Sequence, residues 1–163
     1  MKPAWLGLAF LLAADGADQA ERRDTPAPVV SIDEIPAVSL LPSDSAVVTV
    51  QVRIADGFHV QANPASSEFL VPLELILDGA DGIAFRPPRY PEGTAFRLEG
   101  TMEDLATYHG TITVATTIVA SPDIPPGVLA LTGALRFQAC DSARCLFPAT
   151  VPVSFDLVVG GAD

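Results

Sequence analysis

The chain has 163 residues, which is enough for one domain with its own hydrophobic core and leaves no room for a second domain of ordinary size. Hydrophobic residues make up 49% of it, and 20 acidic against 9 basic residues give a net charge of −11. This composition is typical of a folded acidic protein. It argues against nucleic acids and anionic membrane surfaces as partners, because both repel an acidic surface.

Residues 1–20 have the features of a secretory signal peptide. Lys2 gives a positive start, residues 4–14 are apolar, and small residues follow at Ala14, Gly16, Ala17 and Ala20. The apolar run is too short to cross a bilayer, so we expect export and removal of this segment rather than membrane anchoring. A core helix is the alternative, but the charged residues that follow show no helical periodicity.

Residues 21–45 carry four prolines among charged and small residues, which predicts a linker or a loosely docked arm. From residue 46 onward the pattern changes to strict alternation, with Val48, Val50 and Val52 on one face. This period of two predicts a half-buried strand. Residues 58–60 continue as extended chain, and residues 70–77 predict another strand, in which Pro72 indicates an edge or a strand start.

Residues 79–100 contain seven glycines and prolines, which excludes regular structure for most of this segment. A short helix is expected near residues 101–104, where Thr101 begins a capping pattern. Alternating strands are then predicted over residues 111–119, 129–139 and 151–157.

Six or seven short alternating strands in about 115 residues predict an all-β domain. The expected architecture is an immunoglobulin-like β-sandwich of short antiparallel strands over residues 46–159, followed by a tail at residues 160–163.

Cys140 and Cys145, the only two cysteines, enclose four residues between strand-like segments, which predicts a β-hairpin. Opposed Cα atoms in such a hairpin lie about 4.5–5.5 Å apart, within the range that a disulfide accepts. Closing so short a loop contributes only about 2 kcal/mol of stability. The small stabilising effect favours a redox-active pair, and a structural bridge remains the alternative.

The alternation of the flanking strands predicts where the two thiols face. Cys140 shares the parity of Arg136 and Gln138, so we expect it on the outer, polar face, where a partner can reach it. Cys145 must then face outward too, which requires a bulge at Pro148 that resets the register of the last strand.

A metal site made of both cysteines, His59 and His109 is a weaker alternative, because each histidine adjoins an aromatic residue at the end of a strand. We therefore expect no metal and no cofactor.

Five segments carry a resemblance to a known family: residues 57–64 (GFHVQANP), 68–72 (EFLVP), 90–93 (YPEG), 108–110 (YHG) and 137–148 (FQACDSARCLFP). Together they resemble the N-terminal periplasmic domain of DsbD, the transmembrane thiol:disulfide interchange protein. The resemblance covers residues 45–158, and the F-Q-A-C-x4-C-L-x-P segment is its most specific part.

This resemblance implies an immunoglobulin-like periplasmic domain that takes reducing equivalents from a thioredoxin-like domain. It would pass them to oxidised periplasmic proteins, including those of cytochrome c biogenesis. Cys145 would form the mixed disulfide with a partner, and Cys140 would resolve it. Full-length members continue into transmembrane helices and a thioredoxin-like domain, so we expect a separate membrane thiol reductase as the donor.

The resemblance also implies an aromatic cap over the cysteines. Residues 90–97 occupy the equivalent stretch, with Phe96 as the candidate cap, although the local sequence departs from the family's acidic-Phe-Tyr-Gly pattern. Tyr90, Tyr108 and Phe147 are further candidates around the pair. The alternative function is a non-catalytic immunoglobulin-like binding module in which the disulfide only pins the hairpin.

Overall fold

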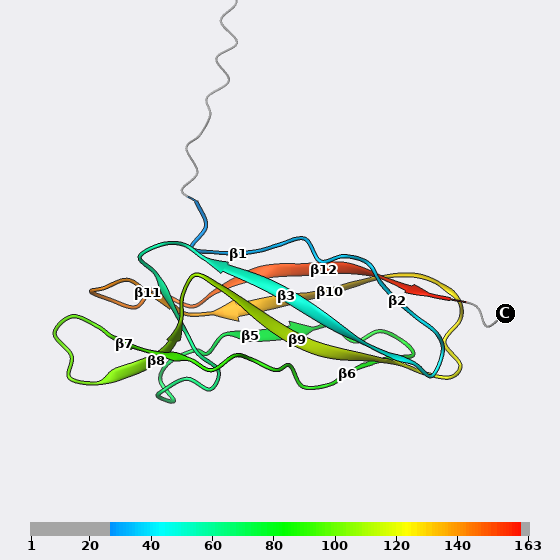
Figure 1. Ribbon diagram of the computed structural model, residues 1–163, viewed down its shortest axis with the longest axis horizontal. Coiled ribbons are helices and arrows are strands. Elements are labelled where there is room, and N and C mark those ends of the chain that lie inside the picture. The colour runs from blue at the N-terminus through cyan, green and yellow to red at the C-terminus, as the bar shows by residue number, and fades with distance from the viewer. Residues whose placement is uncertain (1–26, 161–163) are drawn as a thin grey trace, which may run out of the picture.

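The computed structural model describes residues 27–160, which form twelve β-strands and no helix, arranged as a curled sandwich (Figure 1). The predicted signal peptide lies outside the described residues. The first sheet has the order β1 (Val30–Ile32), β3 (Ser45–Ile54), β9 (Thr111–Ala120) and β6 (Ile83–Phe85). The second has the order β2 (Val38–Leu40), β12 (Ala149–Val159), β10 (Gly127–Phe137) and β5 (Glu74–Leu77).

The hydrophobic core lies between these two sheets and follows the predicted alternation. Val50 of β3 and Val114 of β9 are fully buried, as are Leu135 of β10 and Leu157 of β12. Along β3 and β12, the residues that alternate with the buried ones point to solvent. This is the period of two expected for antiparallel sheets with one face in contact with water. The predicted all-β, immunoglobulin-like sandwich is therefore confirmed.

A third sheet closes one end of the sandwich, away from the C-terminal end of β12 (Figure 1). Its order is β11 (Ala139–Cys140), β4 (His59–Gln61), β8 (Asp104–Tyr108) and β7 (Thr94–Arg97). Three of its strands follow or precede long strands of the sandwich: β4 comes after β3, β8 leads into β9, and β11 comes after β10. This end sheet carries the cysteine hairpin.

Some segments differ from the prediction. β1 and β2 lie within the expected arm, where they pair with β3 and β12 as edge strands. The expected irregular segment contains β6 and β7. The short helix expected at residues 101–104 is wrong, because Thr101 lies in the turn of the β7–β8 hairpin and Arg97 pairs with Asp104 across it.

The structure has no helix within residues 27–160, and therefore none with the length and apolar character of a membrane span.

Candidate functional site

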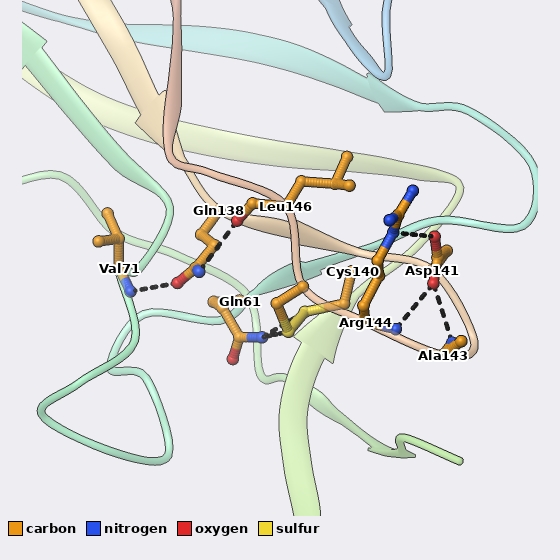
Figure 2. Close-up of a disulfide and its surroundings, with 9 residues drawn as sticks. Gln61, Val71, Gln138, Cys140, Asp141, Ala143, Arg144 and Leu146 are labelled. Carbon is orange, nitrogen blue, oxygen red and sulfur yellow. Dashed lines mark hydrogen bonds and ion pairs between the residues drawn. A yellow bond between two sulfur atoms is a disulfide. The ribbon is translucent and has the colours of Figure 1, made fainter.

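The two cysteines form a disulfide across a hairpin of the end sheet, at the base of its four-residue loop (Figure 2). They occupy opposed antiparallel positions and enclose a loop of four residues, as predicted. Their Cα atoms are 3.8 Å apart, which is closer than the spacing expected from the sequence.

Asp141 fixes the conformation of this loop. Its Oδ1 atom accepts hydrogen bonds from the backbone N–H groups of Ala143, at 2.9 Å, and Arg144, at 2.8 Å (Figure 2). These two hydrogen bonds, in that order, lower the pKa of the Asp141 carboxyl group. The Arg144 guanidinium lies 3.7 Å from the same carboxylate. These contacts fix the turn of the loop in addition to the disulfide.

The two sulfur-bearing residues differ in exposure. Cys140 has no exposed surface, whereas Cys145 is partly exposed. The prediction that Cys140 lies on the outer, polar face is therefore wrong. The prediction failed because the chain changes sheets at Gln138. β10 ends at Phe137, and Cys140 belongs to β11 in a different sheet, so the alternation of β10 does not extend to Cys140.

The predicted bulge at Pro148 is also not formed. β12 begins at Ala149, which pairs with Phe137, and Cys145 lies outside that strand. Because the alternation of β12 never reaches Cys145, no change of register is needed to orient it.

Gln138 holds the base of the hairpin. Its Oε1 accepts a hydrogen bond from the N–H of Val71 at 2.9 Å, and its Nε2 donates to the carbonyl oxygen of Leu146 at 3.1 Å (Figure 2). Its own carbonyl oxygen accepts a hydrogen bond from the N–H of Gln61 at 3.0 Å. Gln138 therefore links three segments beside the disulfide: the chain after Cys145, the segment that precedes β5, and strand β4.

Gln61 contacts the disulfide directly. Its side-chain Nε2 lies 3.1 Å from Cys140 Sγ and 3.9 Å from Cys145 Sγ, and the residue has no exposed surface. Its Oε1 is buried and has no hydrogen-bond partner among residues 27–160. Gln61 carries no periodic signal in the sequence, because Val60, Gln61 and Ala62 are all buried and show no alternation.

His59 lies opposite Cys140, two residues before Gln61 on β4. Its backbone is paired with that of Cys140 across β4 and β11. Its ring stacks on Phe96, with centroids 3.8 Å apart, and lies 5.7 Å from the ring of His109. Burial, and secondarily the charge of His109, lower the pKa of His59, so the imidazole is held neutral near neutral pH.

The β7–β8 hairpin brings the candidate cap to this site. Phe96, in β7, is half-buried against His59. At the far end of the hairpin, the N–H of Glu99 donates a hydrogen bond to the carbonyl oxygen of Ser142 in the cysteine loop at 2.8 Å. The two hairpins are thereby joined beside the disulfide.

The other aromatic candidates have different environments. The Tyr108 hydroxyl accepts a hydrogen bond from the N–H of Asn63 and donates one to the carbonyl oxygen of Pro91. The Tyr90 hydroxyl accepts a hydrogen bond from the N–H of Leu75. Burial raises the pKa of both phenols. Both tyrosines thus fix nearby loops. Phe147, two residues after Cys145, is instead 95% exposed.

Within residues 27–160 there is no group of three or more His, Cys, Asp or Glu side chains arranged to hold a metal ion. The chemistry that this site offers resides in the disulfide.

A family model described as the N-terminal part of the thiol:disulfide interchange protein DsbD matches residues 27–156. No protein with a curated description matches the chain. The seventh ScaB type I cohesin from Pseudobacteroides cellulosolvens is a similar solved structure, at 9% identity and a TM-score of 0.50, with 82% of this chain and 94% of that chain covered. That likeness concerns the fold alone.

Two further solved structures are similar at lower TM-scores. The first is the complex between the DsbD N-terminal and the PilB N-terminal domains from Neisseria meningitidis, at 23% identity and a TM-score of 0.46, with 82% of this chain and 87% of that chain covered. The second is the N-terminal periplasmic domain of ScsB from Proteus mirabilis, at 16% identity and a TM-score of 0.46, with 79% and 44% covered.

Proposed function

Because the chain belongs to the family of DsbD N-terminal domains, we propose that it relays reducing equivalents between periplasmic proteins through Cys140 and Cys145. The observation that carries the proposal is the disulfide itself, which joins the buried Cys140 to the partly exposed Cys145 in a short hairpin. This difference in exposure supports different roles for the two cysteines, with Cys145 as the one that another protein attacks.

The domain takes up electrons in two displacement steps. A donor thiolate attacks Cys145 Sγ, the disulfide breaks, and Cys140 leaves as a thiolate. The second thiolate of the donor then attacks the donor sulfur of the mixed disulfide and releases Cys145. The donor ends as a disulfide, and the domain ends with two reduced cysteines, which with two protons from solvent are thiols.

Delivery of electrons reverses these roles. The Cys145 thiolate attacks a disulfide of the acceptor and forms a mixed disulfide. Cys140 then attacks Cys145 Sγ, which releases the reduced acceptor and restores the intramolecular bridge.

The partners in this proposal are thioredoxin-like periplasmic domains, with a separate membrane thiol reductase as the source of electrons. Proteins that supply reduced cysteines for cytochrome c biogenesis are among the acceptors. Family membership supports this choice, and so does the exposed Phe147 beside Cys145, because exposed aromatic side chains commonly anchor protein interfaces.

A trapping experiment tests the proposal. The Cys140→Ser variant is activated at Cys145 with Ellman's reagent and mixed with a thioredoxin that keeps only its first active-site cysteine. We expect a covalent adduct that dithiothreitol releases. The Cys145→Ser variant, treated in the same way, is the matched control and should form little adduct, because Cys140 is buried.

The rival function, a binding module with a structural bridge, predicts a different redox property. A relay disulfide should have a reduction potential well above about −300 mV, whereas structural disulfides lie below that value. Equilibration with glutathione measures the potential. Absence of the Cys145 adduct together with a potential below that limit would refute the relay.

A further inference from the structure

The buried amide of Gln61 is the polar side chain whose nitrogen lies within hydrogen-bond distance of both sulfur atoms. The two contacts are unequal, since Nε2 lies 3.1 Å from Cys140 Sγ and 3.9 Å from Cys145 Sγ. Figure 2 shows the amide directed at the disulfide from the β4 side. A neutral disulfide sulfur is a weak acceptor, so this contact contributes little while the bridge is intact.

The other end of the same amide has an unmet requirement. Its Oε1 atom is buried and has no hydrogen-bond partner within residues 27–160. Leaving a buried acceptor unpaired costs free energy. In Figure 2 this oxygen points away from the sulfur atoms, so reduction of the disulfide acts on the Nε2 end of the amide. That end then faces a thiol or a thiolate, and a thiolate is a stronger acceptor than a disulfide sulfur.

We propose that Gln61 stabilises the thiolate of Cys140 and thereby makes Cys140 the leaving group, so that partners attack Cys145. This inference rests on the proposed exchange function. When a donor thiolate attacks Cys145 Sγ, the electron pair of the broken S–S bond passes to Cys140 Sγ. The N–H group of Gln61 already lies at that atom, so its hydrogen bond strengthens as negative charge develops.

The same contact assists the return step. Cys140 must be a thiolate to attack Cys145 Sγ and release the acceptor, and a hydrogen bond to the thiolate favours that form. A lower proton affinity of the leaving thiol also speeds its departure. Gln61 therefore acts on the buried sulfur in both directions of the relay.

Charged groups near the pair do not replace this role. His59, opposite Cys140, is held neutral by burial, and His109 lies beyond it. In the loop, the Arg144 guanidinium lies against the Asp141 carboxylate. The Arg144 side chain is 78% exposed, so solvent screens its charge, and the Gln61 amide is the donor that contacts sulfur.

The test measures ionisation of Cys140 alone, in a Cys145→Ser background, from the ultraviolet absorbance of the thiolate as the pH is raised. Gln61→Met keeps the side-chain length and removes the N–H donor. We expect the titration midpoint to move up by about one pH unit. Gln61→Glu, which places a carboxylate at the same position, should move it further in the same direction.

Gln51→Met is the control, because Gln51 is an exposed glutamine on β3 whose amide contacts Thr113 rather than sulfur. It should leave the midpoint unchanged. In the otherwise native pair, Gln61→Met should also slow reduction of the disulfide by dithiothreitol. Thermal melts establish that each variant is folded, and Gln61→Glu serves if Gln61→Met does not fold.

A folded Gln61→Met or Gln61→Glu variant with the native midpoint would overturn the inference. The measurement uses no partner protein, so its outcome is separate from that of the trapping experiment. An unshifted midpoint with normal Cys145 adducts rejects the role of Gln61 alone, whereas a shifted midpoint with no adducts and a potential below about −300 mV rejects the relay.

Discussion

His59 and Cys140 lie directly opposite each other on β4 and β11. Side chains at opposed positions have Cβ atoms about 4.5–5.5 Å apart, so the imidazole is a cross-strand neighbour of the buried sulfur. The same imidazole stacks on Phe96 of the neighbouring hairpin. A substitution of His59 or Phe96 is therefore expected to change the surroundings of the disulfide.

His59 should make the stability of the domain depend on pH. Burial lowers its pKa below the usual 6.5, so the unfolded chain binds the proton more readily than the folded one. The stability of the domain that depends on a neutral His59 is fully present above about pH 6.5. It is lost as the pH falls from there through the pKa of His59 in the folded domain. Urea unfolding at several pH values should show less loss of stability in His59→Phe than in the native domain. An unchanged pH profile would contradict the prediction.

Phe96 should restrict access of small thiols to the disulfide. In Phe96→Ala the ring that stacks on His59 is lost, so we expect faster reduction by glutathione. The unfolding free energy should decrease by about 1 kcal/mol, the typical contribution of an aromatic pair. Stopped-flow reduction and urea titration measure the two effects. Val128→Ala, at an exposed position near the other end of the sandwich, is the control and should leave the glutathione rate unchanged.

Phe147 should contribute to partner binding and not to folding. Its side chain is 95% exposed, so Phe147→Ser should change the unfolding free energy by less than about 0.5 kcal/mol. Loss of an aromatic anchor should slow disulfide exchange with a thioredoxin by about tenfold, while reduction by dithiothreitol keeps its rate. An equal loss with both reductants would show that Phe147 acts on the disulfide itself.

Replacing both cysteines by alanine should lower the unfolding free energy by about 2 kcal/mol, because the closed loop is short. The hydrogen bonds of Asp141 and Gln138 still hold the hairpin in the absence of the bridge. Urea unfolding of the oxidised native domain and the double variant gives the difference. A much larger loss would assign the bridge a structural role.

Alternation in the sequence predicted the body of the sandwich well. β3, β9, β10 and β12 are long strands with one buried face, so polar and apolar residues recur with a period of two that the sequence displays. The hairpin and its disulfide partners were predictable too, since a four-residue loop leaves the cysteines one simple way to meet.

The surroundings of the disulfide were not predictable in this way. β10 ends at Phe137, and after Gln138 the chain enters another sheet with Cys140, which the parity of residues 129–139 cannot reveal. Gln61 lies in a strand that is covered on both faces, where burial leaves no periodic signal. Its contact with sulfur depends on a pairing between segments 79 residues apart in the chain.

The long ladder between β10 and β12 ends at the pair formed by Phe137 and Ala149. Residues 138–148, which include both cysteines, form an excursion that leaves the sandwich after Phe137 and returns to it at Ala149. Insertions, deletions or exchanges within this excursion therefore need not alter the register of the ladder beneath it. Residues 142–144 of this excursion are exposed and lie outside the pairing with β4, so exchanges there can alter the redox properties of the domain while its scaffold is kept.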